Sequence, residues 1–163
     1  MEAGRTMPRI SPFLWFDDQA EEAAKYYCSV FKNSKITNVT HYGEAGPGEA
    51  GSVMTVAFEL DGQEFTALNG GPNFSFTHAI SFVISCKSQD EVDYYWDKLA
   101  ADGEEVQCGW VKDKYGLSWQ VVPEGISDVL AGDDGEGSRR AMEAMFKMKK
   151  LDINELRRAY AGV

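Results

Sequence analysis

Apolar and turn-forming segments follow one another in the same order twice along the 163-residue chain. A strand-length apolar run, a helical segment and three further strand-length runs lie in residues 8–72. The same order returns in residues 73–123, at a spacing of about 70 residues. A single four-stranded sheet would leave its apolar face in water, so the two halves have to cooperate. The repeat therefore predicts an α+β fold with two strand–helix–strand–strand–strand (βαβββ) halves.

The first half is expected to hold a helix over Gln19–Phe31, whose apolar residues recur at spacings of three and four. Asp17 and Asp18 precede this helix as candidate N-cap carboxylates. Asp61-Gly62 predicts a tight hairpin, because glycine accepts the positive φ that such a turn requires. The expected strands are Ile10–Phe16, Lys35–Tyr42, Val53–Leu60 and Gln63–Asn69, and the glycine-rich segment Glu44–Gly51 is expected to be a mobile loop.

The second half is interpreted as the same order, with three of its four strands assigned to residues, and is followed by a helical tail. Ser88 and Glu91 fit a capping box at the start of a helix over Gln89–Ala101. The expected strands are His78–Cys86, Glu105–Trp110 and Leu117–Val122, and the expected tail helices are Ile126–Ala131, Ser138–Lys149 and Ile153–Tyr160, with Gly132–Gly137 as a flexible link. We therefore expect one domain, 8–163, made of the modules 8–72 and 73–123 and the C-terminal helical tail 124–163.

The composition of the chain limits the binding partners and the cellular location that we expect. The formal net charge of -10 repels nucleic acid and anionic lipid, so neither nucleic acid nor a membrane is an expected partner. The three cysteines are odd in number and form no CxxC pair, which favours reduced thiols. No apolar run reaches the roughly 20 residues of a membrane span. Met1–Arg9 lacks the apolar core of a signal peptide, so a cytoplasmic location is expected.

The sequence lacks the common metal and nucleotide motifs. The two histidines, His41 and His78, lie in no HxH, HxxxH or HExxH arrangement, so a metal site would need carboxylates from distant strands. His41 is expected to be solvated, and His78 to lie at the surface or at a strand edge. No GxGxxG, GxxxxGK[ST] or GxSxG motif is present in a context that predicts phosphate binding or a nucleophile elbow.

Several aromatic and neutral polar residues lie within apolar strands. A buried amide or hydroxyl costs free energy unless it is paired, so each of these should meet a protein partner or a ligand. Packing of the tryptophans in the core and a turn role for the asparagine are the alternatives. The candidate residues of a small-molecule pocket are Trp15, Asn69, Ser81, Trp110 and Gln120.

Many short motifs, in order, resemble the PhnB-like branch of the vicinal-oxygen-chelate (glyoxalase/bleomycin-resistance/dioxygenase) superfamily. The resemblance runs from about Pro8 to the C-terminus, and family members are often described as 3-demethylubiquinone-9 3-methyltransferase-like. The segments that carry it include Pro12–Asp17, Ala20–Ala24, Leu60–Gln63, Ala67–Pro72, Glu91–Asp93, Gly109–Trp110, Ser118–Gln120 and Met148–Asp152.

The resemblance implies paired βαβββ modules that form a cupped mixed sheet around a pocket, commonly in a homodimer. It places the metal-ligand positions of the superfamily at Ser11, Ala67, Ser81 and Gln120. Alanine cannot bind a metal, and Ser and Gln are poor ligands for first-row divalent ions. We therefore predict no metal site and no cofactor, with a divalent metal left open as an alternative.

The leading hypothesis is a dimeric small-molecule binder, with catalytic residues and turnover undetermined. One rival is a divalent-metal lyase, transferase or dioxygenase, which would draw on His78, His41 or Glu64. A second rival is a methyltransferase, as the family description suggests, although no glycine-rich S-adenosylmethionine loop is readable. A third is a partner-binding protein that uses the C-terminal helices.

Overall fold

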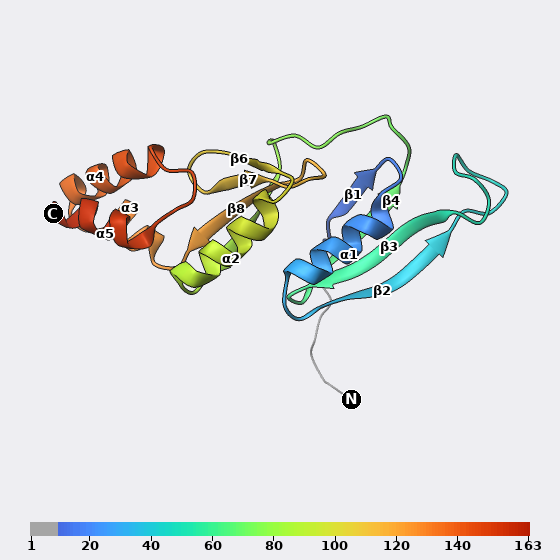
Figure 1. Cartoon of the computed structure of the whole chain (residues 1–163), viewed down its shortest axis with the longest axis horizontal. Helices are drawn as coiled ribbons and strands as arrows, with labels where there is room; N and C mark the ends of the chain where they lie inside the picture. The colour runs from blue at the N-terminus through green and yellow to red at the C-terminus, as the bar shows by residue number, and fades with distance from the viewer. Residues whose placement is uncertain (1–9) are drawn as a thin grey trace. The chain divides into compact units, whose positions relative to one another are not determined.

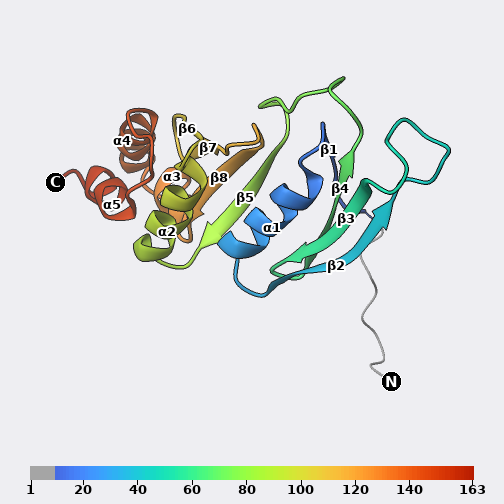
Figure 2. The ribbon, with the colours of Figure 1, turned by 45° about the vertical axis from the view of Figure 1, so that its right-hand side comes forward.

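A computed structural model describes residues 10–163 and divides the chain into two compact units (Figures 1 and 2). The first unit ends at Ser75 and the second spans Phe76–Val163. The segment Met1–Arg9, from which the lack of a signal peptide was predicted, lies outside the described residues. Within residues 10–163, no helix has the length and apolar character to cross a bilayer. The three-part layout into 8–72, 73–123 and 124–163 stays a prediction.

The first unit is a mixed four-stranded sheet covered on one face by a helix. Its strands lie in the order β1-β4-β3-β2, with β1 parallel to β4 and the other pairs antiparallel. Helix α1 packs on β3, and the Tyr27 ring stacks on Phe58 there. The elements are β1 (Phe13–Phe16), α1 (Ala20–Val30), β2 (Ser34–His41), β3 (Val53–Leu60) and β4 (Gln63–Asn69).

Asn69 joins three elements of this unit. Its side-chain oxygen Oδ1 accepts a hydrogen bond from the Ala20 amide at the start of α1, at 2.8 Å. Its side-chain nitrogen Nδ2 donates to the Val53 carbonyl of β3, at 3.1 Å. The predicted N-cap carboxylates of Asp17 and Asp18 are wrong, because the cap position is Gln19 and no cap side chain bonds to the helix. A residue at the end of β4 instead supplies the acceptor.

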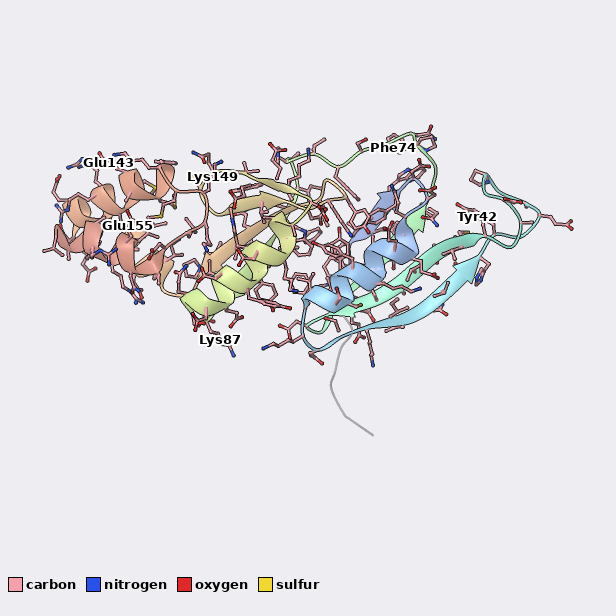
Figure 3. The ribbon with its side chains drawn as sticks, in the orientation of Figure 1. Tyr42, Phe74, Lys87, Glu143, Lys149 and Glu155 are labelled. Atoms are coloured by element: carbon pink, nitrogen blue, oxygen red, sulfur yellow. The ribbon has the colours of Figure 1, made fainter. Side chains whose placement is uncertain are left out.

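The turns of the first unit follow their local chemistry. Asp61 and Gly62 both have positive φ, 50° and 84°, as the predicted tight hairpin requires. Tyr42 is buried at the base of the loop between β2 and β3 (Figure 3), and its hydroxyl donates to the Asn69 carbonyl. The Tyr42 amide donates to the Ser52 carbonyl, and the Gly51 amide donates to the Tyr42 carbonyl. These two backbone hydrogen bonds close the loop.

The second unit begins with the same arrangement. Its sheet has the order β5-β8-β7-β6, again with the first and last strands parallel. Helix α2 buries Val92, Trp96 and Leu99 and packs on this sheet (Figure 1). The elements are β5 (Ser81–Cys86), α2 (Gln89–Ala100), β6 (Glu104–Glu105), β7 (Trp110–Lys112) and β8 (Ser118–Pro123). The α+β class and the twofold βαβββ order predicted from the sequence are confirmed.

The predicted strand Glu105–Trp110 is wrong. Only Glu104 and Glu105 pair with β7, and the chain turns before Trp110. Cys108 and Gly109 have φ of 58° and 83°, values that an extended strand does not contain. This turn exposes two backbone amides that the tail uses.

A buried carboxylate organises the hairpin between β7 and β8. Asp113 is 2% exposed, and its Oδ1 accepts hydrogen bonds from the Tyr115 and Leu117 amides at 2.9 and 3.1 Å. Its Oδ2 accepts from the Trp119 indole at 2.9 Å. These three bonds shape the turn that sets Trp110 opposite Gln120.

The C-terminal tail forms three helices in the second unit: α3 (Ile126–Leu130), α4 (Gly135–Phe146) and α5 (Ile153–Ala161). They share a small core of Val129, Ala141 and Leu156. Asp152 caps α5, because its side chain accepts from the Asn154 and Glu155 amides. The flexible link predicted over Gly132–Gly137 is shorter than expected, since Asp134 caps α4 and the helix already begins at Gly135.

Specific contacts hold the tail against the second sheet. The Cys108 and Gly109 amides donate to the Met148 and Lys149 carbonyls at 2.9 and 2.8 Å. A Cβ atom at Gly109 would lie 2.8 Å from the Leu151 side chain, so this close approach requires glycine. The Gln89 side chain donates to the Leu151 carbonyl at 2.9 Å and accepts from the Ile153 amide at 3.0 Å.

Replacing Asp113 with alanine is expected to lower the free energy of unfolding by about 2–4 kcal/mol, because three buried donors lose their acceptor. Urea denaturation followed by circular dichroism measures this loss. Asp133→Ala, at an exposed position, is the matched control and should change stability by less than about 0.5 kcal/mol. Equal stability of the two variants would refute the structural role of Asp113.

Asn69→Ala is expected to cost about 1–2 kcal/mol, because the start of α1 loses its acceptor and the Val53 carbonyl its donor. Thermal unfolding measures the effect against Asn73→Ala, which changes an exposed asparagine. A stability equal to that of the control would refute this structural role of Asn69.

Candidate functional site

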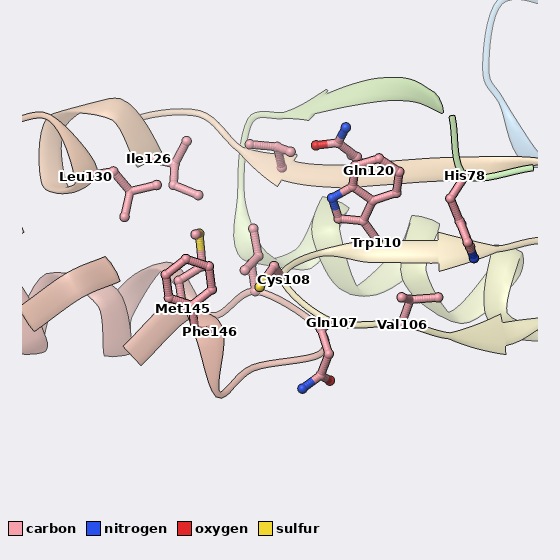
Figure 4. Close-up of a pocket in the computed structure, with 12 residues that line it drawn as sticks. His78, Val106, Gln107, Cys108, Trp110, Gln120, Ile126, Leu130, Met145 and Phe146 are labelled. Atoms are coloured by element: carbon pink, nitrogen blue, oxygen red, sulfur yellow. The ribbon is translucent and has the colours of Figure 1, made fainter. Parts of the chain in front are cut away.

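The second unit contains a cavity of about 670 Å³ (Figure 4), a volume in the range typical of small-molecule sites. One wall is the face of the sheet opposite α2, and the other consists of tail residues. None of the lining side chains is an Asp, Glu, Lys or Arg. The lining residues are His78, Val106, Gln107, Cys108, Trp110, Gln120, Val122, Ile126, Leu130, Met145, Phe146 and Leu151.

Trp110 and Gln120 are direct cross-strand partners of β7 and β8, so their side chains share a face of the sheet. The Gln120 amide nitrogen Nε2 donates to Ser81 Oγ of β5 at 2.9 Å. This bond fixes the orientation of the amide. Its carbonyl oxygen Oε1 has no bonded donor among residues 10–163 and is available to a ligand. Trp110 presents its indole beside this acceptor (Figure 4).

His78 lies at the end of the cavity near Trp110, with the two ring centroids 6.3 Å apart in an edge-on arrangement. Its Nδ1 lies 2.8 Å from Ser118 Oγ, so the imidazole is oriented by a hydroxyl. Ser118 is 1% exposed and does not line the cavity. Because the Ser118 hydroxyl is not exposed to the cavity, the His78–Ser118 pair lacks the geometry of a nucleophile and base acting on a bound ligand.

The far end of the cavity is apolar. Ile126 and Leu130 come from α3, and Met145 and Phe146 from the end of α4 (Figure 4). Cys108 lies between this end and Trp110 in the same view. The cavity thus has a polar end on the sheet and an apolar end on the tail.

The five predicted pocket residues belong to two units. Trp110 and Gln120 line the cavity, and Ser81 holds Gln120 in place. Trp15 and Asn69 belong to the first unit. The Trp15 indole donates to the Gly71 carbonyl at 2.9 Å, and its ring contacts Phe74 edge-on. A single pocket formed by all five residues stays a prediction.

A second cavity, of about 620 Å³, lies within the first unit. Asn69 and Tyr42 contribute to its wall, and both side chains already have protein partners. The lining also includes the carboxylates of Asp17, Asp18, Glu21 and Glu49. Its acidic wall contrasts with the uncharged lining of the first cavity.

The positions assigned to metal ligands by resemblance are divided between the units, Ser11 and Ala67 in the first and Ser81 and Gln120 in the second. Ala67 is fully buried against α1, and Ser11 precedes β1. Within residues 10–163, no three His, Cys, Asp or Glu side chains gather closely enough to hold a metal ion. His41 and Glu64, which the metal-enzyme hypothesis would use, pair with Val53 and Glu59 in the first sheet.

The three cysteines are free thiols in different surroundings. Burial raises the pKa of the Cys86 thiol to about 12, with a further contribution from the Glu91 carboxylate. Burial also raises the pKa of Cys28. These two thiols behave as small apolar side chains. Cys108, in contrast, lines the cavity.

Sequence reasoning missed two parts of this site. His78 was expected at the surface or a strand edge, and it is indeed exposed, but its ring also closes one end of the cavity. The tail was predicted as helices and contributed no residue to the predicted pocket, whereas four of its helical residues form a wall of the cavity. A signal for the second part was the run Met145-Phe146, two large apolar residues at adjacent helix positions, which cannot both face one small core.

Comparison with known proteins agrees with this architecture. The sequence model of the 3-demethylubiquinone-9 3-methyltransferase family matches residues 8–122. This match ends before the tail, whereas the resemblance described in the sequence analysis runs to the C-terminus. Among curated proteins, no sequence matches the chain.

Solved structures of similar proteins match about seven tenths of the chain. The PhnB protein of Bacillus cereus is 38% identical, with a TM-score of 0.65, and the match covers 71% of this chain and 98% of that one. Protein PA1353 of Pseudomonas aeruginosa shares the fold at 17% identity, a TM-score of 0.61 and coverage of 72% and 98%. The product of an Arabidopsis thaliana gene shares it at 18% identity, a TM-score of 0.50 and coverage of 72% and 99%. The chain therefore belongs to the 3-demethylubiquinone-9 3-methyltransferase family, the PhnB-like family that its sequence resembles.

Proposed function

We propose that this protein binds a small, uncharged organic molecule in the cavity of its second unit, using aromatic contact and hydrogen bonds rather than a metal ion. The observation that carries the proposal is the lining of that cavity. It combines an indole face, an oriented amide and an imidazole with apolar side chains, and it includes no charged group. A charged ligand atom inside it would lack a counter-charge, and burying such an atom is costly.

The polar end supplies the specificity that this proposal needs. Gln120 offers its carbonyl oxygen as an acceptor, because its nitrogen is engaged by Ser81. The Nε2 atom of His78 has no hydrogen bond within the described residues, and its tautomer decides whether it donates or accepts. A phenol, an amide or a heteroaromatic ring could use both groups while lying against Trp110. Small-molecule sites typically combine an apolar lining with a few well-placed polar groups.

Methyl transfer is a second candidate, because the family's description names a 3-demethylubiquinone-9 3-methyltransferase. That chemistry needs a methyl donor bound beside the acceptor, and S-adenosylmethionine carries a sulfonium charge. The cavity lining has no carboxylate to pair with this charge. We therefore propose ligand binding rather than methyl transfer. Binding of S-adenosylmethionine is one outcome of the titration that distinguishes the two.

Isothermal titration of the full chain with neutral phenols, quinols, indoles and nucleosides is expected to identify a ligand class. Trp110→Ala should weaken its binding at least about tenfold through loss of the ring contact. Trp15→Ala, in the first unit, is the matched tryptophan control and should leave affinity unchanged if the cavity of the second unit suffices. Binding that requires added divalent metal, or binding of S-adenosylmethionine alone, would overturn the proposal.

A homodimer is part of the proposal, and each sheet has an apolar side chain on the face opposite its helix. Phe13 is 61% exposed and Val83 is 58% exposed. Light scattering after size exclusion is expected to give twice the chain mass, and Phe13→Ser should shift the equilibrium toward the monomer, because burial of a Phe contributes ~1.5–3 kcal/mol. Val163→Ser, at an exposed tail residue, is the control and should leave the monomer–dimer equilibrium unchanged. A monomer at all accessible concentrations would contradict the dimer.

A further inference from the structure

The two ends of the cavity differ in polarity and come from different parts of the chain. The polar end, with His78, Trp110 and Gln120, lies in the part of the chain that the family shares. The apolar end, with Ile126, Leu130, Met145 and Phe146, lies entirely beyond residue 122, where the family match stops. The tail therefore lies outside the matched part of the chain, and it contributes a second compartment to the cavity.

The tail is fixed firmly enough to define this compartment. Two backbone hydrogen bonds, from Cys108 to Met148 and from Gly109 to Lys149, anchor the segment that follows α4. The Gln89 side chain holds the next residues through Leu151 and Ile153. The Asp93 carboxylate pairs with the Lys150 ammonium at 3.0 Å, and this pairing lowers the pKa of Asp93. Contacts on both sides of Leu151 thus set the position of the wall.

The chemistry of the compartment selects its occupant. Its helical side chains carry no hydrogen-bonding group apart from the weak thioether of Met145, so a polar substituent placed there would lose its hydrogen bonds with water. Ile126 and Leu130 offer branched aliphatic surface, and Met145 is unbranched and adapts to irregular shapes. A flexible aliphatic chain fits such surroundings without an unpaired polar atom.

We infer that the C-terminal helices are the specificity element of this protein and that they make it a receptor for neutral amphiphiles, with a polar ring against Trp110 and an aliphatic chain between Ile126, Leu130 and Met145. This inference rests on the proposed function, because it uses the same cavity. It adds the length and polarity of the ligand, which the modules alone do not determine.

A homologous series of 4-alkylphenols, from methyl to hexyl, tests the inference by calorimetric titration of the full chain. Affinity is expected to rise roughly three- to fourfold for each added methylene until the compartment is filled. Met145→Gln, which keeps the side-chain length and adds an amide, should weaken binding of 4-hexylphenol about tenfold and leave 4-methylphenol nearly unchanged.

Phe146→Ser is the second variant, because Phe146 is 61% exposed and its loss should not unfold the protein. It should also flatten the dependence of affinity on chain length. Val163→Ser, at an exposed apolar tail residue outside the cavity, is the control for the tail. Circular dichroism confirms the fold of each variant.

The outcomes separate the two proposals. Equal affinity for every chain length, or equal weakening of short and long probes by Met145→Gln, would overturn the role of the tail while leaving a ligand site at Trp110 intact. Absence of binding for the whole series would overturn the inference, and the wider titration with Trp110→Ala would then decide the proposed function by itself.

Discussion

The parallel pairing of β5 with β8 is the constraint on which the site depends. This pairing brings the first and last strands of the module side by side, so that Ser81 can accept from the Gln120 amide although 39 residues separate them. The hairpin shaped by Asp113 then adds β7 and sets Trp110 opposite Gln120. Because α2 covers the other face of the sheet, the side chains that remain on this face are free to form a cavity wall. The same strand order in the first unit shows that the arrangement belongs to the βαβββ repeat itself.

The tail adds a second wall to this open sheet face. Its position depends on the turn at Cys108 and Gly109, where both residues have positive φ and present their amides to the tail. Gly109 also lets Leu151 approach closely, which any larger residue would prevent. One local feature, a turn in place of the expected strand, therefore both shortens the sheet and docks the helices. The wall of the cavity and the irregularity of the sheet have the same physical cause.

The sequence predicted the elements whose signals are local. Val53–Leu60 and Gln63–Asn69 have the predicted bounds, because alternating apolar residues and the Asp61-Gly62 turn specify a hairpin without help from elsewhere. The start of α1 could not be predicted in the same way, since its acceptor is Asn69, 49 residues further along the chain. Trp110 and Gln120 could be proposed together as site residues because a short hairpin joins them. The docking of the tail could not be predicted, because the carbonyl groups that accept its hydrogen bonds, such as that of Met148, carry no residue-specific signal in a sequence.

Charge links the site to the rest of the molecule. The chain has a net charge of -10, yet the cavity of the second unit is lined without one charged side chain, while the cavity of the first unit carries four carboxylates. An anionic ligand would be repelled at a distance and would find no cation inside, and a cationic ligand would gain more at the acidic cavity than at the neutral one. A neutral ligand escapes both penalties. Selection at the second unit therefore depends on desolvation and shape, the two quantities that the sheet face and the tail helices jointly determine.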